Sequence, residues 1–118
     1  MDDAQFIIKE SKFDYFFGRV NSSPANQRRS IENLENLRLL GIDEASGGKE
    51  RLLEIFSEGL TATQVGQPYN SRYGVTVVRR VEMNGIKTGA IEISYFYPNG
   101  NFDTIPEIST IIVKIYRE

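Results

Sequence analysis

One short stretch of this chain gathers side chains suited to binding a phosphate. Residues 22–30 read Ser-Ser-Pro-Ala-Asn-Gln-Arg-Arg-Ser, which brings hydroxyls, an amide and two guanidinium groups together. Ser23 followed by Pro24 is typical of a helix N-terminus, where free backbone N–H groups and the helix dipole favour an anion. Arg28 and Arg29 would add bidentate phosphate contacts. A capped helix with a solvated arginine face is the simpler interpretation, and composition alone favours it.

Two stretches in the second half of the chain carry other groups that contact nucleic acids. Residues 69–74 form a polar, aromatic segment in which Arg72 and Tyr73 would hold a phosphate or stack on a base. Ser109 and Thr110 open the last expected strand, where their hydroxyls would face a cleft. A turn with ordinary strand aromatics explains the first stretch equally well, and the β-propensity of threonine explains the second.

Several kinds of site are excluded by residue type or spacing. The chain has no cysteine, so disulfides and thiolate metal sites are ruled out, and it has no histidine, the commonest general base. Glu32, Glu35, Asp43 and Glu44 have no spacing that would converge on Mg²⁺. No P-loop, dinucleotide fingerprint or Ser-His-Asp set is present. We therefore expect neither a dedicated metal site nor a cofactor.

Length and composition indicate a single globular domain over residues 1–118. Of these residues 40% are hydrophobic and 25% are charged, values close to the average for globular proteins. No apolar run approaches the ~20 residues that span a membrane, and the acidic N-terminus lacks a signal-peptide pattern, so we expect no membrane contact. The net charge of −2 argues against a large basic footprint on nucleic acid, although a local phosphate-binding cluster remains compatible with it.

The elements that must position these groups are helical in the first half of the chain. Apolar residues recur through residues 23–40, and Gly41 stands where a left-handed helix cap belongs. A second helix is predicted over residues 49–58 and a loop over residues 60–71. The aromatic side chains of residues 6–20 are predicted core, but the pattern there leaves helix and strand both open.

The second half of the chain is predicted to form strands. Alternating apolar residues lead from Val75 to an Asn84-Gly85 hairpin signal and return over residues 87–97. A short strand is predicted over residues 102–105 and a last one over residues 109–116. The predicted fold class is α+β, with N-terminal helices packed on a C-terminal antiparallel β-sheet meander of three to four strands.

Residues along most of the chain resemble the C-terminal toxin domains of polymorphic bacterial toxins, which include contact-dependent growth inhibition proteins and LXG-type effectors. The family pattern runs K-F-x-Y-x-F-G-x-V, S-x-x-H-N-x-x-R-S, a leucine-rich helix ending in L-G-I, a Y-G step and a T-T or S-T pair. It is matched by residues 12–20, 22–30, 40–42, 73–74 and 109–110. The resemblance implies that the domain ends a longer effector, which a producer cell delivers into the cytoplasm of a target cell.

One position departs from this pattern. The family has histidine before the asparagine, whereas this chain has Ala25 before Asn26. Our hypothesis is that alanine replaces a catalytic histidine at position 25 and leaves the toxin inactive. Natural drift is the alternative, because alanine is unremarkable in the first turn of a helix.

The resemblance also implies a nuclease that is neutralised by a cognate immunity protein. The order of helices then sheet is similar to that of the barnase, EndoU and RelE group of metal-independent ribonucleases. In that reading, residue 25 is the general acid or base and Arg29 holds the scissile phosphate. The remaining implied site residues are Ser30, Tyr73 and Thr110 in the catalytic pocket, and Asn26 on the substrate. Arg28 and Arg72 are further substrate-binding candidates by residue type, because the family pattern does not fix these two positions.

The expected activity is cleavage of RNA, with tRNA as one candidate substrate. Metal-free cleavage uses the 2′-hydroxyl, which DNA lacks, so this chemistry would select RNA. One alternative is a metal-dependent DNase toxin that uses the same segment. Another is a non-catalytic binding or immunity module, which the pI of about 5.3 fits better than it fits a nuclease.

Overall fold

The longest helix of the chain begins where the sequence predicts it. In the computed structural model, which describes residues 5–116, α2 spans Pro24–Leu39. Ser23 is its N-cap, and the Ser23 hydroxyl accepts a hydrogen bond from the backbone N–H of Asn26 at 3.1 Å. Gly41 follows with φ +86°, a left-handed conformation that glycine adopts without strain. The helix predicted over residues 23–40 is therefore confirmed.

Two shorter helices flank α2 in the sequence. The segment whose pattern left helix and strand open contains α1, a helix over Ser11–Phe16. A 3₁₀ turn over Glu44–Ser46, labelled η1, leads into α3, which spans Gly48–Gly59 and confirms the second predicted helix. α3 presents a buried face that includes Leu52 and Phe56.

The second half of the chain forms an antiparallel meander, as predicted. β3 spans Gly74–Asn84, β4 spans Thr88–Pro98 and β5 spans Glu107–Ile115. Two very short strands, β1 (Thr63–Gln64) and β2 (Tyr69–Ser71), pair with the side of β3 that faces away from β4. The sheet thus has five strands, and the α+β class with N-terminal helices is confirmed.

Two local predictions were wrong. Residues 60–71 were predicted as a loop but contain β1 and β2, which are too short and too exposed to show an alternating pattern. Residues 102–105 were predicted as a strand but form a turn, in which the Asn101 side chain accepts a hydrogen bond from the backbone N–H of Asp103 at 2.9 Å. Pro106 follows this turn and lacks the N–H that a paired strand would use.

The Asn84-Gly85 hairpin is present, although glycine is needed there for a different reason. The connection from β3 to β4 comprises residues 85–87, and Gly85 is not among the glycines with positive φ. A Cβ atom on Gly85 would lie 2.4 Å from the carbonyl carbon of Leu40, at the end of α2. Glycine therefore allows the hairpin to pack against the helix end.

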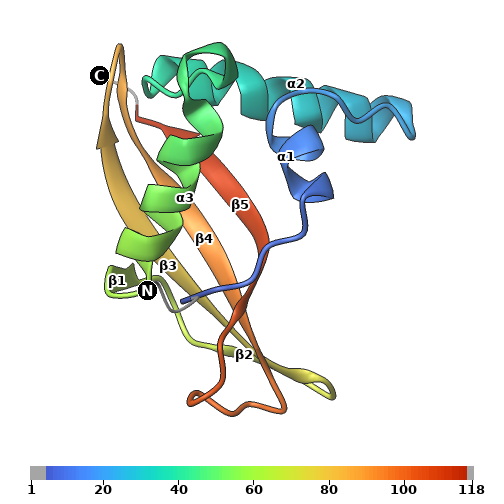
Figure 1. Ribbon diagram of the computed structural model, residues 1–118, viewed down its shortest axis with the longest axis vertical. Helices are drawn as coiled ribbons and strands as arrows, with labels where there is room; N and C mark the ends of the chain where they lie inside the picture. Colours follow the sequence, from blue (N-terminus) through green and yellow to red (C-terminus); the bar gives the residue numbers. More distant parts are fainter. Residues whose placement is uncertain (1–4, 117–118) are drawn as a thin grey trace.

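The helices and the sheet form two layers around one core (Figure 1). Phe16 from α1, Leu37 from α2 and Phe56 from α3 are all fully buried. They belong to one cluster with sheet residues that include Ile93 and Tyr95. Figure 1 shows α2 running across the top of the molecule, above α1 and above the end of β5, the outer strand of the meander. Among the described residues, no helix is long and apolar enough to cross a membrane.

Candidate functional site

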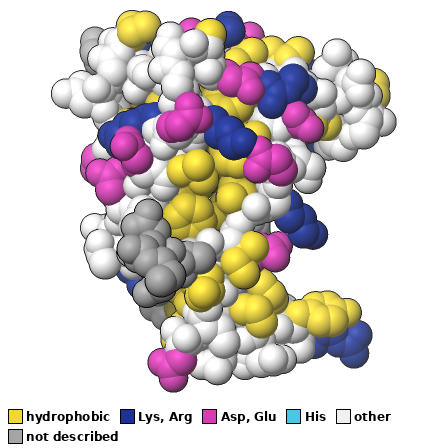
Figure 2. All heavy atoms as spheres, in the orientation of Figure 1, with side chains coloured by type: hydrophobic (Ala, Val, Ile, Leu, Met, Phe, Trp, Pro, Cys, Tyr) yellow, Lys and Arg dark blue, Asp and Glu magenta, His cyan; other side chains and the backbone are white. Residues whose placement is uncertain are grey.

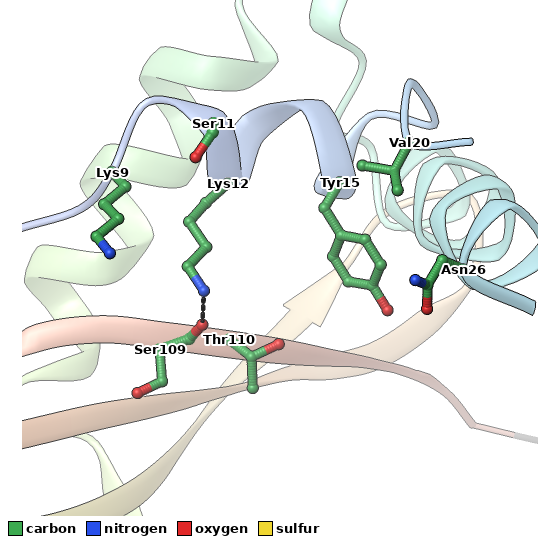
Figure 3. A pocket seen from close by; sticks show the side chains of 8 residues that line it. All are labelled: Lys9, Ser11, Lys12, Tyr15, Val20, Asn26, Ser109 and Thr110. Atoms are coloured by element: carbon green, nitrogen blue, oxygen red, sulfur yellow. Dashed lines mark hydrogen bonds between the residues drawn. The ribbon is translucent and has the colours of Figure 1, made fainter. Parts of the chain in front are cut away.

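A pocket of about 510 Å³ lies where α1, the start of α2 and the first part of β5 come together (Figure 3). The sequence separates these three elements, so the pocket exists only in the folded chain. Its side chains supply ammonium, phenol, hydroxyl and amide groups and no carboxylate. They belong to Lys9, Ser11, Lys12, Tyr15, Val20, Asn26, Ser109 and Thr110.

A β-bulge shapes the β5 side of the pocket. Thr110 pairs with Ser94 and Ile108 pairs with Tyr95, so Ser109 has no partner in β4. A bulge bends its strand and redirects side chains, and bulges are frequent beside active sites. The carbonyl of Ser109 accepts a hydrogen bond from the ammonium of Lys12 at 2.6 Å (Figure 3). The bulge therefore fixes the Lys12 ammonium at the pocket.

Ser30 holds the α1 side of the pocket in place. Its side chain is fully buried, and its hydroxyl donates to the backbone carbonyl of Tyr15 at 2.8 Å and accepts from the backbone N–H of Val20 at 3.3 Å. These bonds tie α2 to the end of α1 and to the segment that follows it. Ser30 was expected in the catalytic pocket, but at 0% exposure its hydroxyl positions Tyr15 and cannot touch a substrate.

The start of α2 brings Asn26 into the pocket. The amide of Asn26 donates to the hydroxyl of Ser22 at 3.0 Å, which orients the side chain. Ala25 precedes it and is exposed, and Arg29 follows one turn later, also exposed. Residues three and four apart are neighbours on a helix surface, so Arg29 stands beside both Ala25 and Asn26. Neither Ala25 nor Arg29 is among the residues that line the pocket; they adjoin it only through their neighbour Asn26.

Three of the expected site residues lie elsewhere. Tyr73 and Arg72 occupy the turn between β2 and β3, next to Gly74, which pairs with Pro98 of β4. Thr110 pairs with Ser94, four residues before Pro98, so the two places are roughly 13 Å apart along the strands. Arg28 lines a separate depression on α2, with neighbours that include Glu32 and Glu35.

Lys9, Lys12 and Tyr15 were missed as site residues. Lys12 and Tyr15 are three residues apart, which places them on one face of α1. The toxin pattern specifies lysine and tyrosine at these two positions. That match could have marked them as candidate site residues. The aromatic side chains of this segment were predicted core, and the half-buried Tyr15 does pack against the core with one side while lining the pocket. A tyrosine can do both because its ring is apolar and its hydroxyl is polar.

Charge distinguishes this pocket from the molecule as a whole. The chain has a net charge of −2, yet the pocket is lined by two lysines and, within the described part of the chain, by no acidic residue. Within residues 5–116, no group of three or more His, Cys, Asp or Glu side chains is placed to hold a metal ion. The pocket is therefore a local cationic site suited to an anion such as a phosphate.

The fold is similar to that of a solved chain. That chain belongs to a contact-dependent growth inhibition toxin–immunity protein complex from Klebsiella pneumoniae 342. The two share 22% sequence identity with a TM-score of 0.73, over 92% of this chain and 99% of the other. At this identity the likeness establishes the fold alone. No protein-family model matches the sequence, and no curated protein sequence matches it.

Proposed function

We propose that this domain is an antibacterial toxin whose pocket between α1, α2 and β5 cleaves RNA without a metal ion. The observation that carries the proposal is the pocket's composition: lysine ammonium, tyrosine phenol, threonine hydroxyl and asparagine amide, with no carboxylate. The fold likeness to a chain of a toxin–immunity complex supports the same class of function. The proposal includes delivery into the target-cell cytoplasm and a cognate immunity protein as partner.

The reaction would be an internal transfer at phosphorus. A general base removes the proton of the 2′-hydroxyl, the 2′-oxygen forms a bond to phosphorus, and the bond from phosphorus to the 5′-oxygen breaks. The leaving 5′-oxygen takes up a proton from a general acid, and a 2′,3′-cyclic phosphate remains. Such a reaction needs one cation on the phosphate, a base that takes the proton of the 2′-hydroxyl, and a proton for the leaving 5′-oxygen, which solvent water can supply.

Lys12 is the proposed cation for the phosphate, because its ammonium is held at the pocket by the Ser109 carbonyl and keeps two N–H groups to donate. Arg29, one turn from Asn26 on α2, would contact the phosphate as well. The hydroxyls of Tyr15 and Thr110 and the amide of Asn26 would orient the ribose and the phosphate oxygens. All of these groups are assigned to binding and positioning the substrate.

Position 25 is where the missing base belongs in this proposal. A histidine there would stand next to Asn26, which lines the pocket, and one turn from Arg29. Its imidazole would titrate near neutral pH, which suits it to accept the proton of the 2′-hydroxyl. With Ala25 the chain keeps its binding groups and lacks the base, so we expect it to bind RNA and cleave it very slowly.

A paired nuclease assay tests the proposal. Ala25→His and Ala25→Gln are compared with the unaltered chain on total RNA and on plasmid DNA, each with and without EDTA. We expect only Ala25→His to cleave RNA, at a rate that EDTA does not change and that depends on a group titrating near pH 6.5. The glutamine control has similar bulk and no titratable group, so it should remain inactive.

The other outcomes identify the rival functions. Cleavage of DNA that requires added Mg²⁺ would indicate the metal-dependent DNase toxin. Absence of cleavage by the folded Ala25→His protein, with protection of cells against another toxin, would indicate the immunity module. A thermal melt of Ala25→His checks folding, and we expect little change in Tm because Ala25 is exposed.

A further inference from the structure

A second polar depression lies at the end of the sheet away from the β3–β4 turn. It has a volume of about 330 Å³ and lies between the β2–β3 turn and the turn that follows β4. Asn70 and Ser71 line it from β2, Arg72 lines it from the β2–β3 turn, and Asn99 lines it from the turn after β4. Within residues 5–116 no acidic side chain contributes to its wall, so the depression combines one cation with amide and hydroxyl groups.

Three exposed aromatic residues belong to the chain segments that form this depression. The side chains of Tyr69, Tyr73 and Phe102 are 66%, 70% and 59% exposed. Figure 2 shows hydrophobic and basic side chains together at the lower end of the molecule, where Figure 1 places the β2–β3 hairpin. Large apolar groups that stay in water without contributing to the core indicate a surface that binds something else.

Arg72 carries a charge that no acidic side chain within residues 5–116 neutralises. Its guanidinium lies 5.9 Å from the centre of the Tyr73 ring, close enough for a cation–π contact. Among the ion pairs of residues 5–116, none involves Arg72. An arginine stacked on a tyrosine keeps its outer N–H groups free to bind a phosphate, while the other ring face can stack on a base.

We propose that this depression is a second nucleotide-binding site, which takes a single-stranded segment of RNA outside the cleavage pocket. A base would stack on Tyr73, the adjoining phosphate would bind Arg72, and the amides of Asn70 and Asn99 would contact base or sugar edges. A polar lining with a free cation suits a nucleotide better than it suits the apolar centre of a protein interface. This inference rests on the proposed function, because it assumes that RNA is the substrate.

The distance between the two sites determines the minimum length of an RNA that can occupy both. The depression and the pocket are roughly 13 Å apart along the strands, more than the width of one nucleotide. An RNA that reaches both must therefore extend several nucleotides beyond the scissile bond. The proposed second site thus selects an oligonucleotide or a folded RNA with an unpaired segment over a dinucleotide.

Binding measurements on the chain with Ala25 test this without interference from cleavage. Fluorescence anisotropy of a fluorescein-labelled 12-nucleotide oligouridylate gives Kd for the unaltered chain, Tyr73→Ala, Arg72→Ala and Lys12→Met. Lys87→Ala is the matched control, because Lys87 is exposed in the β3–β4 turn at the opposite end of the sheet. A thermal melt of each variant verifies that it is folded.

We expect Tyr73→Ala to weaken binding about tenfold, as the loss of one stacked base does. Arg72→Ala should lower the slope of log K against log salt by about 0.7, the value for one phosphate contact on a single strand. Lys87→Ala should change neither quantity.

Two outcomes would overturn the inference. The first would leave the proposed function intact, and the second would contradict it as well. If Lys12→Met weakens binding but the two hairpin variants do not, RNA binds only at the pocket and the exposed hairpin serves a protein partner. If the unaltered chain does not bind the oligonucleotide at all, RNA is not the ligand and the proposed function fails as well.

Discussion

The ammonium of Lys12 donates a hydrogen bond of 2.6 Å to the carbonyl of Ser109, across 97 residues of sequence. It joins α1 to the bulge of β5 and so closes one side of the pocket. Ser109 has no partner in β4. The backbone of β5 at this residue is therefore held by the bulge and by the hydrogen bond from Lys12. The same ammonium is thus a structural link and the proposed phosphate ligand.

We predict that Lys12→Met, introduced into the Ala25→His protein, lowers the rate of RNA cleavage by about 100-fold or more. The reason is the loss of a cation that stabilises charge developing on the phosphate. Tm should fall by only a few degrees, because the lost hydrogen bond is partly exposed. Rates on a labelled oligoribonucleotide and a thermal melt provide the two measurements.

Lys12→Arg is the matched control for this change, since it keeps the charge and a donor for Ser109. It should fold normally and retain more activity than Lys12→Met. If Lys12→Met cleaved RNA as fast as its parent, Lys12 would be a structural link only.

Ser30→Ala should destabilise the domain without removing any group that touches the substrate. Its buried hydroxyl bonds the backbone of Tyr15 and Val20, and replacing it leaves a buried carbonyl without its donor, at a cost of about 1–3 kcal/mol. Urea unfolding measures this loss, and Ser46→Ala on the exposed 3₁₀ turn serves as a control with little expected effect. A Ser30→Ala protein of unchanged stability but no activity would contradict the positioning role.

Tyr95 should make the stability of the domain fall at high pH. Its hydroxyl is buried and donates to the carbonyl of Phe56 at 2.6 Å, and burial raises the pKa of this phenol above its ordinary value of 10.0. Above pH 10 the unfolded chain therefore loses a proton that the folded chain keeps. The free energy of unfolding should fall by up to about 1.4 kcal/mol per pH unit from this group.

Urea unfolding of the unaltered chain and of Tyr95→Phe at pH 8, 10 and 11 isolates this contribution, since the other tyrosines and the lysines cancel in the difference. Below pH 10, Tyr95→Phe should be less stable by about 1 kcal/mol, because one hydrogen bond is lost. The difference should shrink as the pH rises above 10. A difference that is constant across this range would show that Tyr95 ionises equally well in the folded chain.

Local sequence patterns were sufficient to predict the main elements of the fold. Ser23 and Gly41 marked the two ends of α2, and the change from a helical to an alternating pattern located β3, β4 and β5. Caps, turns and apolar periodicity depend on residues a few positions apart, so they can be read along the chain. β1 and β2 were not predicted, because strands of two or three exposed residues show no alternating pattern of apolar side chains.

The composition of the candidate site depended on contacts between distant residues. The sequence placed Asn26 and Thr110 in one pocket, and the fold brings them together there. It also grouped Tyr73 with them, but strand pairing offsets Tyr73 from Thr110 by roughly 13 Å along the strand direction. The register of a strand depends on how it pairs with its neighbours and packs on the core. A sequence motif does not specify which residues pair across strands.

The α+β class, the principal helices and strands, and a family resemblance with a departure at position 25 could all be predicted from the amino-acid sequence. The burial of Ser30, the bulge at Ser109 and the contact of Lys12 with that bulge at a cationic pocket became known from the folded structure. These features arise where α1, α2 and β5 pack against one another. Their physical cause is burial and register between segments up to 97 residues apart, which no local pattern encodes.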